Sequence, residues 1–206
     1  MQKIMFNDKY GLTQAVLAKR KTQTRRIITN KEMLEIIRNF DYPSSFFLFY
    51  DRFFLNPDLR KRFINNRRVM RYQQNETVAI AQSYKDIHKE ILREVGDLEL
   101  RDEFLQSKGY TNKMFVRADK MPHAIRITNI RIERLQDISE EDCLKEGILR
   151  GYDVGSDSMT YWYHGLANSS FRTPQEAYAS FIDRISGKGT WESNPYVFVY
   201  DFELID

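Results

Sequence analysis

Apolar residues recur at two different spacings in the first forty residues of the chain. The short apolar run KIMF at residues 3–6 predicts a strand. Between residues 12 and 19, apolar positions recur three and four residues apart, which predicts an amphipathic helix. The segment KEMLEIIRNF at 31–40 has a similar pattern. We therefore expect a strand and two helices before residue 41.

The segment 21–28 lies between these two helices and is rich in β-branched residues, so it predicts an extended strand. Successive side chains of a strand point to opposite faces. Thr22, Thr24 and Arg26 therefore share one face, and Lys21 and Gln23 take the other.

Three further strands are predicted by alternation. Residues 76–84 alternate after Asn75, a residue that tolerates the left-handed turn conformation. In 124–135 the isoleucines occupy odd positions first and even positions afterwards. This change of phase at Thr128-Asn129 predicts a β-bulge. The aromatic residues of 194–205 alternate along a closing strand.

Capping residues delimit two helices near the C-terminus. Ser139, with Asp142 three residues later, begins one helix that Gly147 ends, and Thr173 begins another that ends at Gly187. The stretch 150–172 between them is predicted to be a long loop. Short strands combined with short helices predict an α+β fold built around a small β-barrel.

The composition is that of a globular protein, with 42% hydrophobic and 30% charged residues in 206. We expect a single domain over 1–206. No apolar run approaches the ~18 residues of a transmembrane helix, and the N-terminus lacks the apolar stretch of a signal peptide, which predicts a cytoplasmic protein without a membrane partner. Cys143 is the one cysteine and is expected to be a buried apolar residue. With three widely spaced histidines, the sequence predicts neither a metal site nor a cofactor.

Positive charge is concentrated at the start of the chain. Residues 1–75 hold 16 Lys and Arg against 6 Asp and Glu. Two segments are expected to be insertions, about 31–71 and 85–113. The first mixes aromatic residues with cations, and its basic patch, Arg67, Arg68 and Arg71, could bind nucleic acid phosphates. The alternative is a solvated face over inward-packed aromatics.

The stretch KRKTQTRR, Lys19 to Arg26, is the most informative motif, with five basic residues in eight. Together with MPHAIRITNIRIERLQDISEEDCLKEGI and GKGTWESNPYVFVYDFEL, it resembles the ASCH domain of the PUA-like superfamily, and in particular the proteins of about 200 residues carried by bacteria and phages. The family signature places Gly, Lys, Glu or Thr, and Arg at positions that are Lys19, Lys21, Thr24 and Arg26 in this chain.

This resemblance implies a PUA-like barrel with flanking helices and a cleft that binds RNA or a modified nucleoside. One bacterial branch of the family hydrolyses N4-acetylcytidine with a lysine, a threonine and a glutamate, which correspond here to Lys21, Thr24 and Glu146. Arg26, Arg25 and Trp162 are the expected ligand-binding residues.

Amide hydrolysis at this site requires a neutral lysine. Thr24 would attack the acyl carbon, and Lys21 would accept its proton. The ordinary lysine pKa of about 10.4 leaves few neutral amines at pH 7, although burial and neighbouring cations lower it. A direct Lys21–Glu146 ion pair would instead favour a structural or ligand-orienting role.

Three other functions remain open on the sequence. The chain could be a non-catalytic nucleic-acid-binding module, or a ribonuclease that needs no metal. It could also be an accessory protein of a phage or mobile element that binds a partner through the aromatic segment 40–54.

Overall fold

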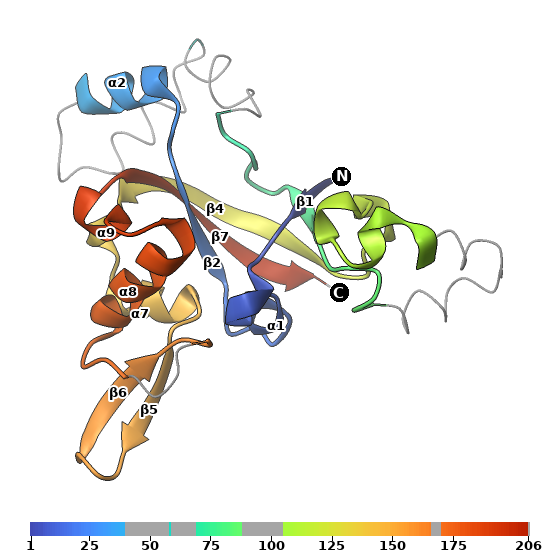
Figure 1. Cartoon of the computed structure of the whole chain (residues 1–206). Helices are drawn as coiled ribbons and strands as arrows, with labels where there is room; N and C mark the ends of the chain where they lie inside the picture. The colour runs from blue at the N-terminus through green and yellow to red at the C-terminus, as the bar shows by residue number, and fades with distance from the viewer. Residues whose placement is uncertain (40–57, 59–68, 88–104, 166–169, 206) are drawn as a thin grey trace.

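In the computed structural model, residues 1–39, 58, 69–87, 105–165 and 170–205 are described. Their centre is a five-stranded mixed sheet in the order β1-β3-β4-β7-β2 (Figure 1). The strands are β1 (Gln2–Ile4), β2 (Gln23–Ile27), β3 (Thr77–Ile80), β4 (Ala124–Arg134) and β7 (Tyr196–Ile205). The α+β class predicted from the sequence is therefore confirmed.

The sheet is open, so the predicted closed barrel is wrong. β1 pairs with β3 in parallel, and the remaining pairs are antiparallel. Within the described ranges, β1 and β2 are the two edges, and no strand pairing joins them. A barrel would require a continuous ladder between these edges. The Arg26 side chain of β2 instead reaches the Met5 carbonyl, just after β1, and donates to it at 3.2 Å.

The β4–β7 pair is the longest ladder, and it contains the predicted bulge. Its register shifts between Ile127 and Asn129, where Asn129 pairs with Asp201. The shift keeps Ile125 and Ile127 buried before it, and Ile130 and Ile132 after it. The sequence therefore located this bend correctly, because a strand can bury both isoleucine pairs only by inserting one residue between them.

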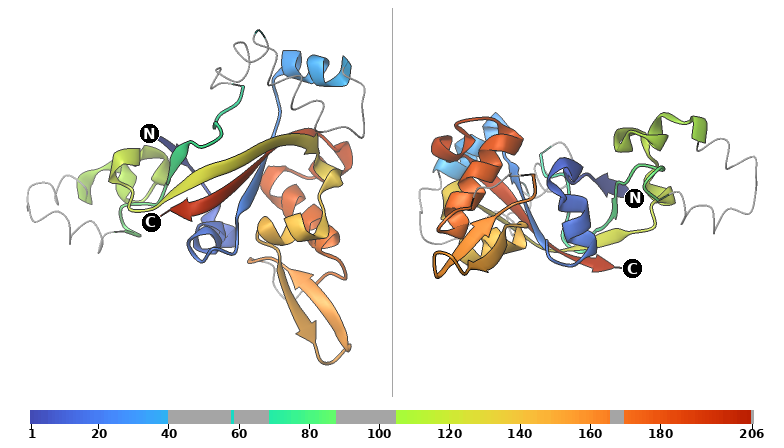
Figure 2. Two further views of the ribbon diagram at one scale, coloured as in Figure 1. Left: turned by 180° about the vertical axis from the view of Figure 1, so that it is seen from behind. Right: turned by 60° about the horizontal axis from the view of Figure 1, so that its bottom comes forward.

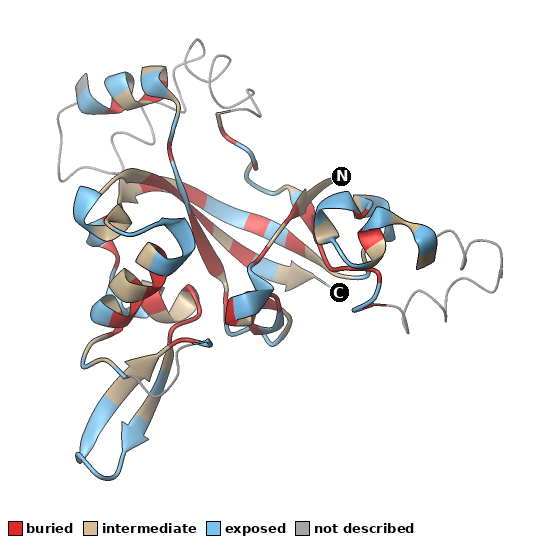
Figure 3. Ribbon diagram, in the orientation of Figure 1, coloured by how far each residue is buried: buried red, intermediate tan, exposed pale blue. Residues whose placement is uncertain are grey.

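Helices gather around one end of the β4, β7 and β2 strands (Figures 1 and 2). They are α7 (Glu140–Lys145), α8 (Pro174–Ser186) and α9 (Thr190–Ser193). The Ser139 side chain accepts a hydrogen bond from the Asp142 amide, and Thr173 accepts one from Glu176. Both predicted caps are confirmed. Figure 3 shows buried residues along these strands and on the helix surfaces that pack against them.

Strand β2 runs from α1 (Leu12–Leu17) to α2 (Lys31–Asn39), so both predicted N-terminal helices are present (Figure 1). The described part of the chain also contains single turns of 3-10 helix: η1 (Asp8–Tyr10), η3 (Lys108–Tyr110), η4 (Lys113–Phe115), η5 (Ala118–Lys120) and η6 (Leu135–Asp137). The Lys3 ammonium joins β1 to the segment that follows the second predicted insertion, since it donates hydrogen bonds to the carbonyls of Met114 and Val116 at 2.6 and 2.7 Å.

The predicted loop 150–172 is wrong over most of its described length. β5 (Leu149–Asp153) and β6 (Ser158–Trp162) pair as an antiparallel hairpin that projects away from the sheet (Figure 1). Gly151 lies close to the Trp162 ring: a Cβ at this position would lie 2.6 Å from it, so a larger residue would displace the ring. The hairpin is largely exposed, so its sequence has no clean apolar face to reveal it.

Among the described residues, four residues other than glycine have a positive φ: Lys19, Asn75, Asp157 and Asn194. Asn75 has φ 63°, as the sequence predicts before β3. Lys19 has φ 57° just after α1 and donates its amide to the Val16 carbonyl at 2.8 Å. The φ of Lys19 is one that glycine adopts without strain.

Replacing Lys19 with glycine should therefore stabilise the protein. We expect Lys19→Gly to raise the free energy of unfolding by about 0.5–1 kcal/mol, because it relieves the left-handed strain of a residue with a Cβ. Urea denaturation followed by circular dichroism measures this change. Arg20→Gly is the matched control, because Arg20 is the next exposed cation and has no positive φ; it should destabilise. Equal effects of the two substitutions would contradict the argument.

Candidate functional site

Lys21 and Glu146, two residues singled out from the sequence, form a buried ion pair. The Lys21 ammonium donates to Glu146 Oε2 at 2.6 Å and to the Glu146 main-chain carbonyl at 2.8 Å. Lys21 lies between α1 and β2, and Glu146 follows the last turn of α7. The Thr22 amide also donates to the Lys145 carbonyl at 3.0 Å, so main chain and side chains together join the start of β2 to α7.

Arg25 occupies the centre of a larger network of carboxylates. Its guanidinium contacts Glu146 Oε1 at 3.2 Å, Glu133 Oε1 at 2.5 Å and Asp142 Oδ2 at 3.1 Å. It also lies 6.0 Å from the centroid of the Tyr178 ring, which comes from α8. The Arg25 side chain is therefore enclosed by β4, α7 and α8, and its donors are occupied by the protein itself. Arg25 also lines the cavity that contains Lys21 and Thr24. Because the carboxylates occupy its donors, it is suited to a positioning role, and its contact with a ligand stays a prediction.

The network continues across the sheet surface through polar residues of β4 and β7. Arg131 donates to Asp201 Oδ2 at 2.7 Å and also pairs with Asp142. Gln23 donates to Asp201 Oδ1 at 2.6 Å, and Asn129 donates to Asp201 Oδ2 at 3.1 Å. None of these residues belongs to the site predicted from the sequence. The predicted bulge was the available signal, because it places Asn129 and Arg131 on the face opposite the buried isoleucines.

The charges of this network shift the pKa values of its members. Burial lowers the pKa of Lys21 below its ordinary value, and this outweighs the raising effect of Glu146. Burial opposes the charge of Arg25 as well, but Glu146 and Glu133 raise its pKa. Burial would raise the pKa of Asp142, yet the guanidinium groups of Arg131 and Arg25 lower it. Arg25 is thus a fixed cation, whereas burial shifts the pKa of Lys21 toward loss of its proton.

The third predicted residue, Thr24, lies beside the ion pair in the same cavity. The cavity measures about 620 Å³ and is lined by Lys21, Thr24, Arg26 and Glu146, and by apolar residues that include Phe6, Phe181 and Ile182. Thr24 is 5% exposed. Among the described residues, none forms a hydrogen bond with its hydroxyl. The hydroxyl is therefore available to a ligand in the cavity.

The remaining predicted site residues are dispersed. Arg26 lines the cavity, as expected, and donates to the Met5 carbonyl at 3.2 Å. Trp162 does not line it, because this residue packs on Gly151 within the hairpin. Of the predicted nucleic-acid patch, Arg71 lies near β3, whereas Arg67 and Arg68 fall outside the described residues, as does the aromatic segment 40–54.

Cys143 is buried, as predicted. Burial raises the pKa of its thiol to about 12, and a thiol with that pKa supplies almost no thiolate nucleophile at neutral pH. In the described ranges, no cluster of three or more His, Cys, Asp or Glu residues could hold a metal ion. No helix among them is both long and apolar enough to cross a membrane.

Comparison of the chain with protein-family models, with curated proteins and with solved structures finds no match. The assignment of roles in this cavity therefore depends on its geometry and on the residues of the KTQTRR motif.

The Lys21–Glu146 pair should contribute to stability as a coupled unit. Lys21→Met alone leaves Glu146 with one partner fewer, and Glu146→Gln alone leaves a buried ammonium. Breaking a buried pair on one side costs about 3–5 kcal/mol. We expect the double substitution to cost less than the sum of the two by about 1–3 kcal/mol, as measured by denaturant unfolding.

The exposed pair formed by Arg126 and Glu203 is the control for this cycle. Both of its side chains are 50% exposed, so water screens their attraction. The equivalent cycle with Arg126→Met and Glu203→Gln should give a coupling below about 1 kcal/mol. Equal coupling in the two cycles would show that burial does not strengthen the Lys21–Glu146 interaction.

Proposed function

We propose that this protein is an ASCH-like domain of the PUA-like superfamily that binds a modified nucleoside or an RNA base in the cavity beside β2. The observation that carries the proposal is the position of the Thr24 hydroxyl, which has no hydrogen bond within the described residues and lies in one cavity with the buried Lys21–Glu146 pair. The cavity of about 620 Å³ falls within the range of about 300–1,000 Å³ that is typical of small-molecule sites.

The donors that remain in the cavity suit a carbonyl group. A lysine ammonium has three donors, of which Lys21 uses two for Glu146. Its third N–H and the Thr24 hydroxyl can both donate to a ligand oxygen, such as the carbonyl of a pyrimidine or of an acyl group. Glu146 holds the ammonium in place, because both of its carboxylate oxygens are occupied by Lys21 and Arg25. Phe6 and Phe181 supply apolar surface for a base.

Binding should depend on the Thr24 hydroxyl. Thr24→Val keeps the shape of the side chain and removes the hydroxyl, so the affinity for N4-acetylcytidine or cytidine should fall about tenfold, the equivalent of one hydrogen bond of about 1.4 kcal/mol. Isothermal titration calorimetry measures this loss.

Thr22→Val is the matched control, because Thr22 is the preceding threonine of the same motif and does not line the cavity. It should bind like the wild type. If neither nucleoside binds the wild-type protein, or if the two valine variants behave alike, the proposed ligand site is wrong.

Hydrolysis of N4-acetylcytidine is a second candidate function for the same cavity. The lowered pKa of Lys21 favours it, because a neutral amine is the form that accepts a proton. Thr24 Oγ would bond to the acyl carbon while Lys21 takes the hydroxyl proton. That proton would pass to the leaving nitrogen as the C–N bond breaks, and water would then release acetate from Thr24. The direct ion pair with Glu146 opposes this role, since it stabilises the ammonium.

The pH dependence of turnover tests this candidate. Lys21 acts as a base only when it is neutral, so the hydrolysis rate should rise with pH. Because its folded-state pKa lies below the ordinary value, the rate should level off below about pH 10.4. Thr24→Val and Lys21→Met should both abolish turnover in an assay of acetate release. No turnover by the wild type at any pH from 6 to about 10 would leave a binding function alone.

A further inference from the structure

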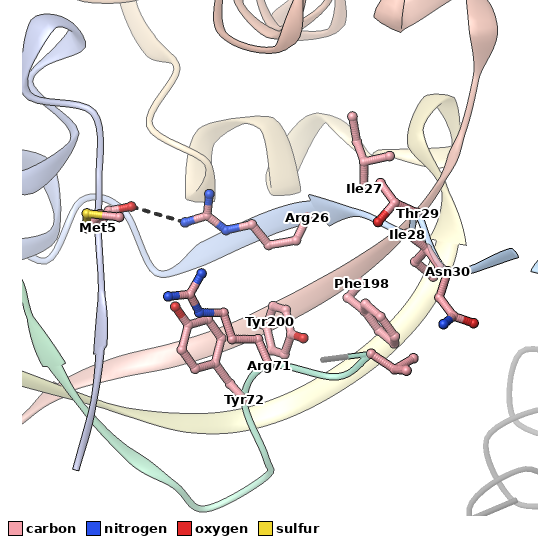
Figure 4. A pocket seen from close by; sticks show the side chains of 11 residues that line it. Met5, Arg26, Ile27, Ile28, Thr29, Asn30, Arg71, Tyr72, Phe198 and Tyr200 are labelled. Carbon is pink, nitrogen blue, oxygen red and sulfur yellow. Dashed lines mark hydrogen bonds between the residues drawn. The ribbon is translucent and has the colours of Figure 1, made fainter. Parts of the chain in front are cut away.

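A second, smaller cavity lies on the other side of Arg26. It measures about 240 Å³ and opens between the two edges of the sheet, where Met5 follows β1 and Arg26 belongs to β2. Figure 4 shows the hydrogen bond from Arg26 to the Met5 carbonyl and the aromatic rings of Tyr72, Tyr200 and Phe198 on the opposite side. Because it is smaller than the typical range of about 300–1,000 Å³ for whole ligands, it suits one group of a ligand.

Two guanidinium groups line this cavity. Arg26 comes from the KTQTRR motif, and Arg71 comes from the chain just before β3. Figure 4 shows both side chains extending toward the same end of the cavity, by Tyr72. Arg71 lies 5.8 Å from the centroid of the Tyr72 ring. Both arginines also lower the pKa of the Tyr72 hydroxyl, against the dominant raising effect of its burial.

No aspartate or glutamate is among the described residues that line this cavity. Of the described residues, no acidic side chain forms an ion pair with Arg26, which donates to the Met5 carbonyl. A guanidinium has five N–H donors, so Arg26 keeps most of its donors for a ligand. Two arginines in one concave site attract an anion, and their planar forks match the oxygens of a phosphate group.

Arg26 lines both cavities, which makes them adjacent parts of one binding surface. We propose that the smaller cavity is a phosphate subsite formed by Arg26 and Arg71, so that a nucleotide or an RNA phosphodiester binds more tightly than a free nucleoside. The inference rests on the proposed function, because the nucleobase of the ligand would occupy the larger cavity beside Thr24. The phosphate group would be bound through Arg26 and Arg71.

Calorimetric titration of the full chain with cytidine, cytidine 5′-monophosphate, a short single-stranded RNA and inorganic phosphate tests the subsite. The monophosphate or the RNA should bind at least about tenfold more tightly than cytidine, because a charge-assisted hydrogen bond contributes about 1.5–3 kcal/mol. This advantage should shrink as salt is raised. A gain with RNA alone would identify a phosphodiester as the ligand group, and a gain with the monophosphate would identify a nucleotide.

Arg71→Gln should remove the phosphate advantage and leave cytidine binding unchanged, because Arg71 does not line the larger cavity. Arg172→Gln is the matched control, since it removes an equal charge from an exposed residue that lines neither cavity. If Arg71→Gln does not fold, Arg71→Lys is the second variant. It keeps the positive charge but loses the planar guanidinium, so it should weaken phosphate binding. Thermal unfolding of each variant verifies folding.

The outcomes separate this inference from the proposed function. Equal affinity for cytidine, its monophosphate and RNA, or equal effects of Arg71→Gln and Arg172→Gln, would overturn the phosphate subsite while the nucleoside site stands. Binding of inorganic phosphate that depends on Arg71, without any binding of cytidine, would support the subsite and overturn the nucleoside site.

Discussion

The buried guanidinium of Arg25 is the interaction on which the site depends. It lies among carboxylates from three places in the chain: Glu133 on β4, and Asp142 and Glu146 at the two ends of α7. A buried cation is stable only when its donors are satisfied, so these elements must meet around β2 in one arrangement. The same carboxylate that receives Arg25 also holds Lys21, and the cavity is therefore positioned by electrostatics as much as by apolar packing.

This arrangement explains why residues of similar charge in one short motif have different roles. Arg25 is occupied inside the protein, whereas Arg26, the next residue, projects from the other face of β2 toward the gap between the sheet edges. Lys21 lies between these extremes, because its pKa is lowered by burial while Glu146 opposes the loss of its proton. The Thr24 hydroxyl, which has no hydrogen bond among the described residues, lies in the same cavity as Lys21.

Sequence patterns predicted the local structure well where strand alternation or helix capping determines it. The change of phase at Thr128-Asn129 located the bulge, and the caps at Ser139 and Thr173 located two helices. The hairpin at 149–162 was missed, because Tyr152, Val154 and Met159 are exposed and no face of it is consistently apolar. The barrel prediction failed for a different reason. Closure depends on whether two distant edges pair, and alternation within one strand contains no information about its neighbours.

The sequence by itself determined the strand at β2, the polar alternation along it, and the resemblance that selected Lys21, Thr24 and Glu146. The tertiary structure alone decided which charges pair. Glu146 lies 125 positions from Lys21, and only packing of α7 against β2 brings its carboxylate within 2.6 Å of the ammonium. It also assigned Arg25 to the interior and placed Arg71 in one cavity with Arg26. Contacts of this kind depend on desolvation and on three-dimensional proximity, which residue spacing does not specify.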